Sequence, residues 1–214
     1  MKIKTTFINK MLFFIYLKKY DKLFIVEVDI LNIKNKMESI EMIKELNLNK
    51  FPEQLFKEND EKSVLEFLRK YPAKYYAIRD KSKAGGTFKL MVESDKVLEE
   101  IKDYSLYTIN VSSANYVENQ LLVGEIQILS NNEVYLTLST DPKATVRDAI
   151  SKPMFNIKSN IFDNTLNLVP YFDEIYQYII DNELKDIIVE FALFNKNVGI
   201  KNERIIVYEL RTDY

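Results

Sequence analysis

Residues 79–86 hold the densest group of anion-binding residue types in the sequence. Two of the chain's four glycines, Gly85 and Gly86, stand together there. Glycine pairs let backbone N–H groups approach an anion closely, and neighbouring cations neutralise its charge. The nearby cations are Arg79, Lys81 and Lys83. The segment matches neither a P-loop nor a dinucleotide-binding fingerprint. It therefore predicts a phosphate-binding loop, with a hairpin turn carrying solvated charges as the alternative.

Two glutamates and an arginine occupy matching places in the last two apolar runs. Glu190 lies late in residues 187–190, and Glu209 lies late in residues 206–211. Residues i and i+2 share one face of a strand, so Glu209 and Arg211 are expected to point the same way. Carboxylates so placed can hold Mg²⁺, and an arginine can contact a phosphate. The alternative is a structural glutamate–arginine pair at the end of a sheet.

A third candidate site lies in the middle of the chain. Glu125 and Gln127 stand two residues apart within a hydrophobic run. This acidic–x–polar spacing is found in metal-dependent nucleases, and Asp141 or Asp148 would be the partner of Glu125 in such a site. The alternative is a half-buried strand whose polar residues share one face. Cleavage of nucleic acid that depends on a divalent cation would distinguish the two.

The composition excludes several classes of chemistry. The 214 residues include no cysteine and no histidine, which excludes disulfides, thiolate metal sites and the hydrolase mechanisms that need a histidine base. Any bound cation is expected to be Mg²⁺ or Mn²⁺ held by oxygen ligands. A formal net charge of −2 does not favour a nucleic-acid partner. With 47% hydrophobic residues the chain can bury a core.

The apolar runs are too short to cross a membrane. The longest covers residues 11–17 and is bounded by lysines on both sides, whereas a spanning helix needs about 20 residues. The run is also short for a signal peptide, and no small-residue cleavage site follows it. We expect a cytoplasmic protein without a membrane partner.

Periodicity and turn residues predict alternating strands and helices. The expected strands are residues 23–30, 75–78, 87–92, 107–111, 121–129, 134–138, 186–193 and 204–210, and residues 11–16 form either a strand or a short helix. The expected helices are residues 37–48, 60–71, 94–104, 145–150 and 167–184.

From residue 72 onward, the order of these parts resembles the nucleotide-binding half of the ATP-grasp superfamily. A strand, a basic Gly-Gly loop, a strand, a helix and a strand precede a β-rich half, which ends in a helix, an acidic strand and the Glu209-x-Arg211 strand. The resemblance implies an ATP-grasp-like α+β fold with two mixed or antiparallel sheets and flanking helices. It also implies two parts: an N-terminal α/β segment over residues 1–71 and an ATP-grasp-like domain over residues 72–214.

The same resemblance implies roles for individual residues. In that family a cation on the first strand contacts nucleotide phosphates, a glycine-rich loop covers them, and acidic residues on the last strands carry Mg²⁺. By position, the cation is Arg79, the loop glycines are Gly85 and Gly86, and the metal ligands are Glu190 and Glu209. Arg211 would lie beside the phosphates, and Lys81, Lys83 and Lys89 are the further cofactor-binding cations.

Two positions depart from the family pattern. Lysine is the more usual residue where Arg79 stands, although some branches that phosphorylate pyruvate or related acids look similar with arginine. The last strand of the family usually carries an acidic residue followed by asparagine and a basic residue, and Glu209-Leu210-Arg211 lacks that asparagine. These departures leave open a degenerate relative that binds nucleotide weakly or not at all.

The resemblance implies a protein that binds ATP with Mg²⁺ and, when active, transfers a phosphoryl group to a small carboxylic acid. An amine or thiol would then capture the acyl phosphate, as in a carboxylate ligase. Positioning and electrostatics supply such catalysis, so the absence of histidine is no obstacle. One alternative is a non-enzymatic interaction domain with a degenerate nucleotide site and a protein partner. The other is the metal-dependent nuclease.

Overall fold

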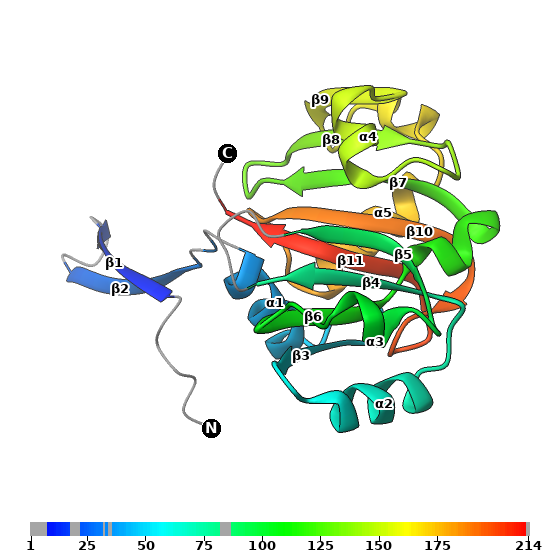
Figure 1. Ribbon diagram of the computed structural model, residues 1–214. Coiled ribbons are helices and arrows are strands. Elements are labelled where there is room, and N and C mark those ends of the chain that lie inside the picture. Colours follow the sequence, from blue (N-terminus) through cyan, green and yellow to red (C-terminus); the bar gives the residue numbers. More distant parts are fainter. Residues whose placement is uncertain (1–7, 18–21, 32, 34–35, 82–86, 213–214) are drawn as a thin grey trace.

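Two antiparallel sheets with flanking helices make up most of the molecule, as the sequence predicts (Figure 1). The computed structural model describes residues 8–17, 22–31, 33, 36–81 and 87–212. One sheet has five strands in the order β11-β10-β7-β8-β9, and the other has four in the order β3-β6-β4-β5. A separate two-stranded hairpin, β1-β2, completes the described strands.

The five-stranded sheet is antiparallel throughout: β7–β8 and β10–β11 are hairpins, and a long-range pairing of β10 with β7 joins them. Its strands are β7 (Gln120–Ile128), β8 (Glu133–Ser139), β9 (Phe155–Asn160), β10 (Ile188–Val198) and β11 (Glu203–Arg211). The turn between β7 and β8 contains Asn132, whose φ of 70° is a conformation that asparagine tolerates. Gly124 lets β7 approach β8, because a Cβ there would lie 2.0 Å from the carbonyl oxygen of Thr137.

The four-stranded sheet carries its helices on one face. Its strands are β3 (Glu53–Lys57), β4 (Tyr75–Asp80), β5 (Phe88–Glu93) and β6 (Leu106–Val111), and its helices are α2 (Glu61–Lys70) and α3 (Val97–Glu100). Val64 and Phe67 of α2 are buried against this sheet, whereas Leu65 is 43% exposed. The spacing of Val64, Phe67 and Leu68 fixes the inward stripe of α2. β3 precedes residue 72 and pairs with β6, so the sheet joins both sides of the predicted domain boundary.

Two buried clusters hold the molecule together. The first lies between the five-stranded sheet and helix α5 (Phe172–Asp181), and includes Val189, Leu210 and Ile175. The second contains residues from both sheets, such as Ile78 of β4 and Ile206 of β11. Aromatic rings reinforce the second cluster where the sheets meet: Phe51 and Tyr116 stack at 5.1 Å between ring centroids, and Phe194 and Tyr208 lie against Phe51.

Shorter elements connect or cover the sheets. They are α1 (Lys36–Glu45), the 3₁₀ turns η1 (Ser113–Asn119) and η2 (Asn164–Leu168), and α4 (Val146–Ser151). The hairpin strands are β1 (Ile8–Leu17) and β2 (Lys22–Leu31), which settles residues 11–16 as strand. The hairpin lies apart from the two larger sheets in Figure 1. None of the helices in the described part of the chain has the length and apolar character of a membrane span.

Several elements differ from the sequence prediction. The helix expected over residues 167–184 begins only at Phe172, because Tyr171 adopts a left-handed conformation with φ of 60°. The helix expected over residues 94–104 is a single turn, α3. Strands β3 and β9 were not predicted. Both are short edge strands whose polar residues hide the alternation that a prediction would need.

Candidate functional site

One face of the five-stranded sheet carries a group of polar side chains from β7, β10 and β11. Ile126, Val189 and Leu210 are buried in the cluster on the α5 side. Successive residues of a strand point to opposite faces, so the neighbours of these three project from the other face. Those neighbours are Glu125, Gln127, Ile188, Glu190, Glu209 and Arg211. We call this surface the polar face.

Strand register aligns five polar residues across the polar face. Glu190 of β10 is the Cα partner of Glu209 on one side and of Glu125 on the other. The same row continues through Thr137 of β8 to Asn156 of β9. Directly opposed residues in a sheet lie close together, so three carboxylates stand side by side. The sequence predicted two of these carboxylates for one site, and the register adds Glu125.

Arg211 joins two of the three carboxylates. Its Nη2 lies 2.7 Å from Oε2 of Glu125 and 3.1 Å from Oε1 of Glu190. The side chains of Glu125 and Glu190 are only 21% and 17% exposed, so water screens these ion pairs less than it screens pairs at the open surface. One guanidinium thus links carboxylates from two different strands of the row.

The guanidinium of Arg211 keeps unused donor capacity. Its Nε is buried and has no hydrogen-bond partner among the residues that the structure describes. A buried donor without a partner is costly, and such donors are commonly satisfied by water or by a ligand. Arg211 therefore anchors the carboxylates through one nitrogen and can donate to a further acceptor through another.

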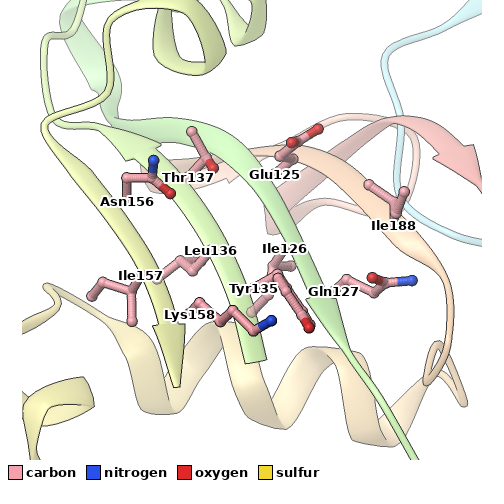
Figure 2. A pocket seen from close by; sticks show the side chains of 10 residues that line it. All are labelled: Glu125, Ile126, Gln127, Tyr135, Leu136, Thr137, Asn156, Ile157, Lys158 and Ile188. Atoms are coloured by element: carbon pink, nitrogen blue, oxygen red, sulfur yellow. The ribbon is translucent and has the colours of Figure 1, made fainter. Parts of the chain in front are cut away.

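A small hollow lies beside the carboxylate row. Figure 2 shows its lining, which comes from strands β7, β8 and β9 and from Ile188 of β10, with Glu125, Thr137 and Asn156 at one end and Tyr135 and Lys158 at the other. Its volume is about 130 Å³. Ligand pockets for drug-sized molecules run to about 300–1,000 Å³, so the hollow by itself is too small for a nucleotide.

Arg79 lies on the four-stranded sheet, on the face away from the helices. Ile78 is buried in the cluster that contains α2 and α3 residues, so its neighbour Arg79 points to the other side. The guanidinium carbon of Arg79 lies 4.5 Å from the ring centroid of Phe88, across the β4–β5 pair. Strands β4 and β11 end on the same side of the molecule in Figure 1, so Arg79 and Arg211 stand near corresponding ends of the two sheets.

The remaining cations of the predicted loop are only partly described. Lys81 is half-buried, and its backbone N–H donates to the carbonyl of Leu106 at 2.7 Å. Lys83, Gly85 and Gly86 lie outside the described residues. The phosphate-binding role of this loop therefore stays a prediction.

Lys89 stands apart from Arg79. It pairs in register with Ile78, on the helix-covered face of the sheet, and forms an ion pair with Glu100 of α3. The hydrogen bond with Glu100 raises the pKa of Lys89. The structure thus separates Lys89 from Arg79 by the thickness of the sheet.

The residues of the nuclease alternative are divided between two places. Glu125 and Gln127 share the polar face, but Asp148 caps α4 by accepting hydrogen bonds from the backbone N–H and the hydroxyl of Thr145. These hydrogen bonds lower the pKa of Asp148. Asp141 accepts a hydrogen bond from the backbone N–H of Lys143 in an exposed turn. No group of three or more acidic side chains with metal-binding geometry occurs among the described residues.

Sequence reasoning assigned Glu125 to the nuclease alternative and missed its contact with Arg211. The only sequence signal for the position of Glu125 was the alternation of apolar and polar residues between residues 123 and 127. That alternation predicts which face Glu125 occupies. It does not predict which strand lies beside β7, because the register of β7 with β10 joins residues more than 60 positions apart.

Comparisons with known proteins find a likeness of fold only. No family model matches the chain, and no curated protein sequence matches it. Solved structures of ATP-grasp enzymes resemble it in part. The ADP complex of N5-carboxyaminoimidazole ribonucleotide synthetase has a TM-score of 0.45 and 10% identity, over 84% of this chain and 45% of that chain. D-alanine–D-alanine ligase from Helicobacter pylori has a TM-score of 0.42 and 12% identity, over 83% and 53%.

A third solved structure is the macrocyclase MdnC from Microcystis aeruginosa bound with its precursor peptide, with a TM-score of 0.42 and 14% identity over 81% of this chain and 51% of that chain. The chain spans about half the length of the solved structures it matches. At these TM-scores the likeness carries no function, so the geometry of the chain's own residues has to support any functional inference.

Proposed function

We propose that the polar face binds ATP with Mg²⁺. The observation that carries this proposal is the contact of one arginine nitrogen with two carboxylates, Glu125 and Glu190, in a row that a third carboxylate, Glu209, extends. Carboxylates in a row can hold a cation, and an arginine whose Nε keeps donor capacity can contact an anion. A magnesium nucleotide supplies both charges in one ligand.

Glu190 and Glu209 are the proposed metal ligands. Mg²⁺ is usually held by one or two carboxylates, several waters and substrate phosphates rather than by a closed protein cage. Two carboxylates on paired positions of β10 and β11 match that requirement. The metal would neutralise charge on the phosphates and hold them against the sheet.

The two arginines are the proposed phosphate contacts. Arg211 can donate through its buried Nε, and Arg79 presents a guanidinium from the other sheet. Guanidinium groups contact phosphate oxygens through strong charge-assisted hydrogen bonds. The loop cations Lys81 and Lys83, and the glycines Gly85 and Gly86, would extend this contact over the phosphates.

We further propose that bound ATP supports phosphoryl transfer to a carboxylate. An oxygen of the acid would bond to the γ-phosphorus as the bond to the β,γ-bridging oxygen breaks, which yields an acyl phosphate and ADP. An amine or thiol would then attack the acyl carbon, phosphate would leave, and the proton of the nucleophile would pass to solvent. The chain would contribute positioning and charge, which such transfers chiefly need.

The test is the shift in thermal midpoint with ATP, with and without Mg²⁺. A ligand at about 100 times its dissociation constant adds about 2.7 kcal/mol of stability. We expect the shift to need Mg²⁺, to disappear with EDTA, and to be lost in Glu190→Gln. The exposed Glu66→Gln on α2 is the matched control and should keep the shift. A shift that Glu190→Gln retains, or no shift with any nucleotide, would refute the proposal.

A protein-interaction domain is the second candidate, because large apolar side chains are exposed around β9. Met154, Phe162 and Leu168 are 61%, 81% and 77% exposed, respectively. A contiguous apolar patch at this place would be typical of a contact surface. Joint substitution of Arg79 and Glu209 distinguishes the candidates, because it should abolish nucleotide binding under the first and leave partner binding intact under the second.

A further inference from the structure

The two edges of the five-stranded sheet differ in what covers them. Along β11, neighbouring segments bond to the edge: the carbonyl of Asn49 accepts from the backbone N–H of Val207, and the hydroxyl of Ser39 accepts from that of Leu210. β9 lies at the other end of the strand order, at the top of the molecule in Figure 1. Among the described strands it pairs with β8 alone. β9 is therefore the open edge of this sheet.

Alternate residues of β9 direct their backbone groups away from β8. The backbone N–H of Ile161 donates to the carbonyl of Asn132, which fixes the hydrogen-bonded positions of the β8–β9 ladder. Every second residue of an antiparallel strand faces its partner in this way, so the N–H and C=O groups of Asn156 and Lys158 face outward. Neither backbone forms a hydrogen bond with another of the described segments. Unpaired groups of this kind are a template for one more strand.

β9 is a regular strand with apolar side chains beyond both of its ends. Its pairing with β8 runs from Phe155 to Asn160 without a register shift, so no bulge twists the edge away. The strand contains no proline, and Lys158 is its only charged residue. Met154, just before the strand, is 61% exposed, and Phe162, just after it, is 81% exposed. The edge thus has few of the features that keep open edges from pairing.

We propose that β9 is a dimer interface, in which it pairs antiparallel with β9 of a second copy of this chain about a twofold axis at Ile157. To keep each face of the sheet continuous, the axis must pass beside a residue rather than between two residues. With the axis at Ile157, Asn156 lies opposite Lys158 of the second copy, and their outward backbone groups form both hydrogen bonds of such a pair. An axis at Lys158 would place two ammonium groups opposite each other, which is destabilising.

The exposed apolar residues favour the same register. Within one chain Met154 and Phe162 are eight positions apart, or roughly 26 Å in an extended strand. With the proposed axis, Met154 lies opposite Asn160 of the second copy, and Phe162 of that copy follows two residues later. Diagonal neighbours of this kind are within reach of aromatic and long side chains. An axis at Asn156 would instead place Lys158 opposite Met154 and move Phe162 two residues farther away.

The dimer does not depend on the proposed nucleotide site. It uses the outer edge of β9, whereas the nucleotide proposal uses residues of β4, β10 and β11. It also gives the exposed residues around β9 a partner, a second copy of this chain. Two short strands bury little surface, so the dissociation constant of the dimer is expected to be of about micromolar order.

Sedimentation velocity of the full chain over a concentration series, without nucleotide, measures the dimer. Asn156→Pro removes one outward N–H from each copy, and an edge strand tolerates proline where the N–H faces away from the sheet. We expect this variant to raise the dissociation constant about tenfold or more. Lys57→Pro is the matched control at the edge of the other sheet. The N–H of Lys57 faces away from β6, because its register partner Leu106 accepts from Lys81 of β4's side instead, so the dimer should be unchanged.

The absence of cysteine from the chain permits a direct test of the register. In the proposed pair, Asn156→Cys of one copy faces Lys158→Cys of another at a Cα separation of about 5.5 Å, which a disulfide spans. We expect air oxidation of an equimolar mixture of these two variants to give crosslinked dimers, and either variant alone to give far fewer. A mixture of Asn156→Cys with Glu66→Cys, on the exposed side of α2, controls for random collision.

Three results would overturn the inference: a wild-type chain that stays monomeric at the highest concentration, an Asn156→Pro variant that dimerises like the wild type, or a cysteine mixture that crosslinks no better than its single variants. The thermal midpoint of Asn156→Pro shows whether that variant folds, and the crosslinking test does not depend on it. A failed ATP shift in a chain that dimerises would overturn the nucleotide proposal alone.

Discussion

The guanidinium of Arg211 organises the polar face because it contacts two carboxylates on two different strands. Glu125 belongs to β7 and Glu190 to β10, and neither side chain is more than a quarter exposed. Without the arginine these carboxylates would stand opposite one another with like charge, which is destabilising in a sheet. Arg211 thus serves stability and the proposed ligand site at once.

Replacement of Arg211 tests both of these roles. We expect Arg211→Met to lower the free energy of unfolding by about 1–2 kcal/mol, because it removes the ion pairs of Arg211 with two half-buried carboxylates. It should also abolish the Mg²⁺-dependent ATP shift. Urea unfolding measures the first effect and thermal melts the second. Arg69→Met, on the exposed side of α2, should change neither.

Asp148 gives a prediction that depends on pH. Its carboxylate caps α4, and the capping hydrogen bonds hold its pKa below the ordinary value of 3.8. A lowered pKa means that the stabilisation is complete above pH 3.8 and is lost as the pH falls through the lowered value. We expect Asp148→Ala to lower the thermal midpoint at neutral pH, and the difference from wild type to shrink in strong acid.

Melts at about pH 7 and about pH 2.5 measure this difference. The control is Asp103→Ala. Asp103 is exposed, and its carboxylate makes no capping contact among the described residues, so this variant should show little difference from wild type at either pH. A destabilisation by Asp148→Ala that is as large in acid as at neutral pH would contradict the capping account.

Among the elements, the β10–β11 hairpin matters most for the site, because it carries Glu190, Glu209 and Arg211. The buried side chain of Asn49 holds the far end of that hairpin. Its Nδ2 donates to the carbonyls of Val198, Glu203 and Ile205 at 2.9–3.2 Å. Its Oδ1 accepts from the backbone N–H of Lys201 at 2.9 Å.

We expect Asn49→Ala to lower the free energy of unfolding by about 3 kcal/mol, since it leaves several buried backbone groups without partners. Asn195→Ala, at an exposed position of β10, should stay within about 0.5 kcal/mol of wild type. Urea unfolding of both variants checks this. Equal stability of the two variants would show that Asn49 does not hold the hairpin.

The sequence predicted most of these elements, since their patterns are local. The stripe of α2 and the alternation of β7, β10 and β11 can be read within a dozen residues. The start of α5 could not be read, because a left-handed Tyr171 breaks a pattern that looks continuous. β9 was missed since Asn156, Lys158 and Asn160 fill the exposed positions of a strand with only two large apolar residues.

For the molecule as a whole, the candidate site depends on strand order, which the sequence does not contain as a local signal. Glu209 and Arg211 are neighbours in sequence, and their shared face was predictable. Glu125 reaches Arg211 only because β7 lies next to β10 in the sheet. The α+β class with antiparallel sheets was predicted and is confirmed. The division at residue 72 stays a prediction.

The two sheets share one buried cluster and end their β4 and β11 strands on the same side (Figure 1). The proposed nucleotide site requires that Arg79 and the carboxylate row contact one ligand. The proposed nucleotide site thus needs both sheets.

The most direct measurement of the nucleotide proposal replaces Mg²⁺ by paramagnetic Mn²⁺, which oxygen ligands also hold. In NMR spectra of the chain with ATP, Mn²⁺ should broaden the backbone signals around Glu125, Glu190 and Glu209 and leave those of α2 sharp. Glu190→Gln should abolish this broadening. Broadening centred on any other part of the chain, or none at all with saturating Mn²⁺ and ATP, would contradict the account.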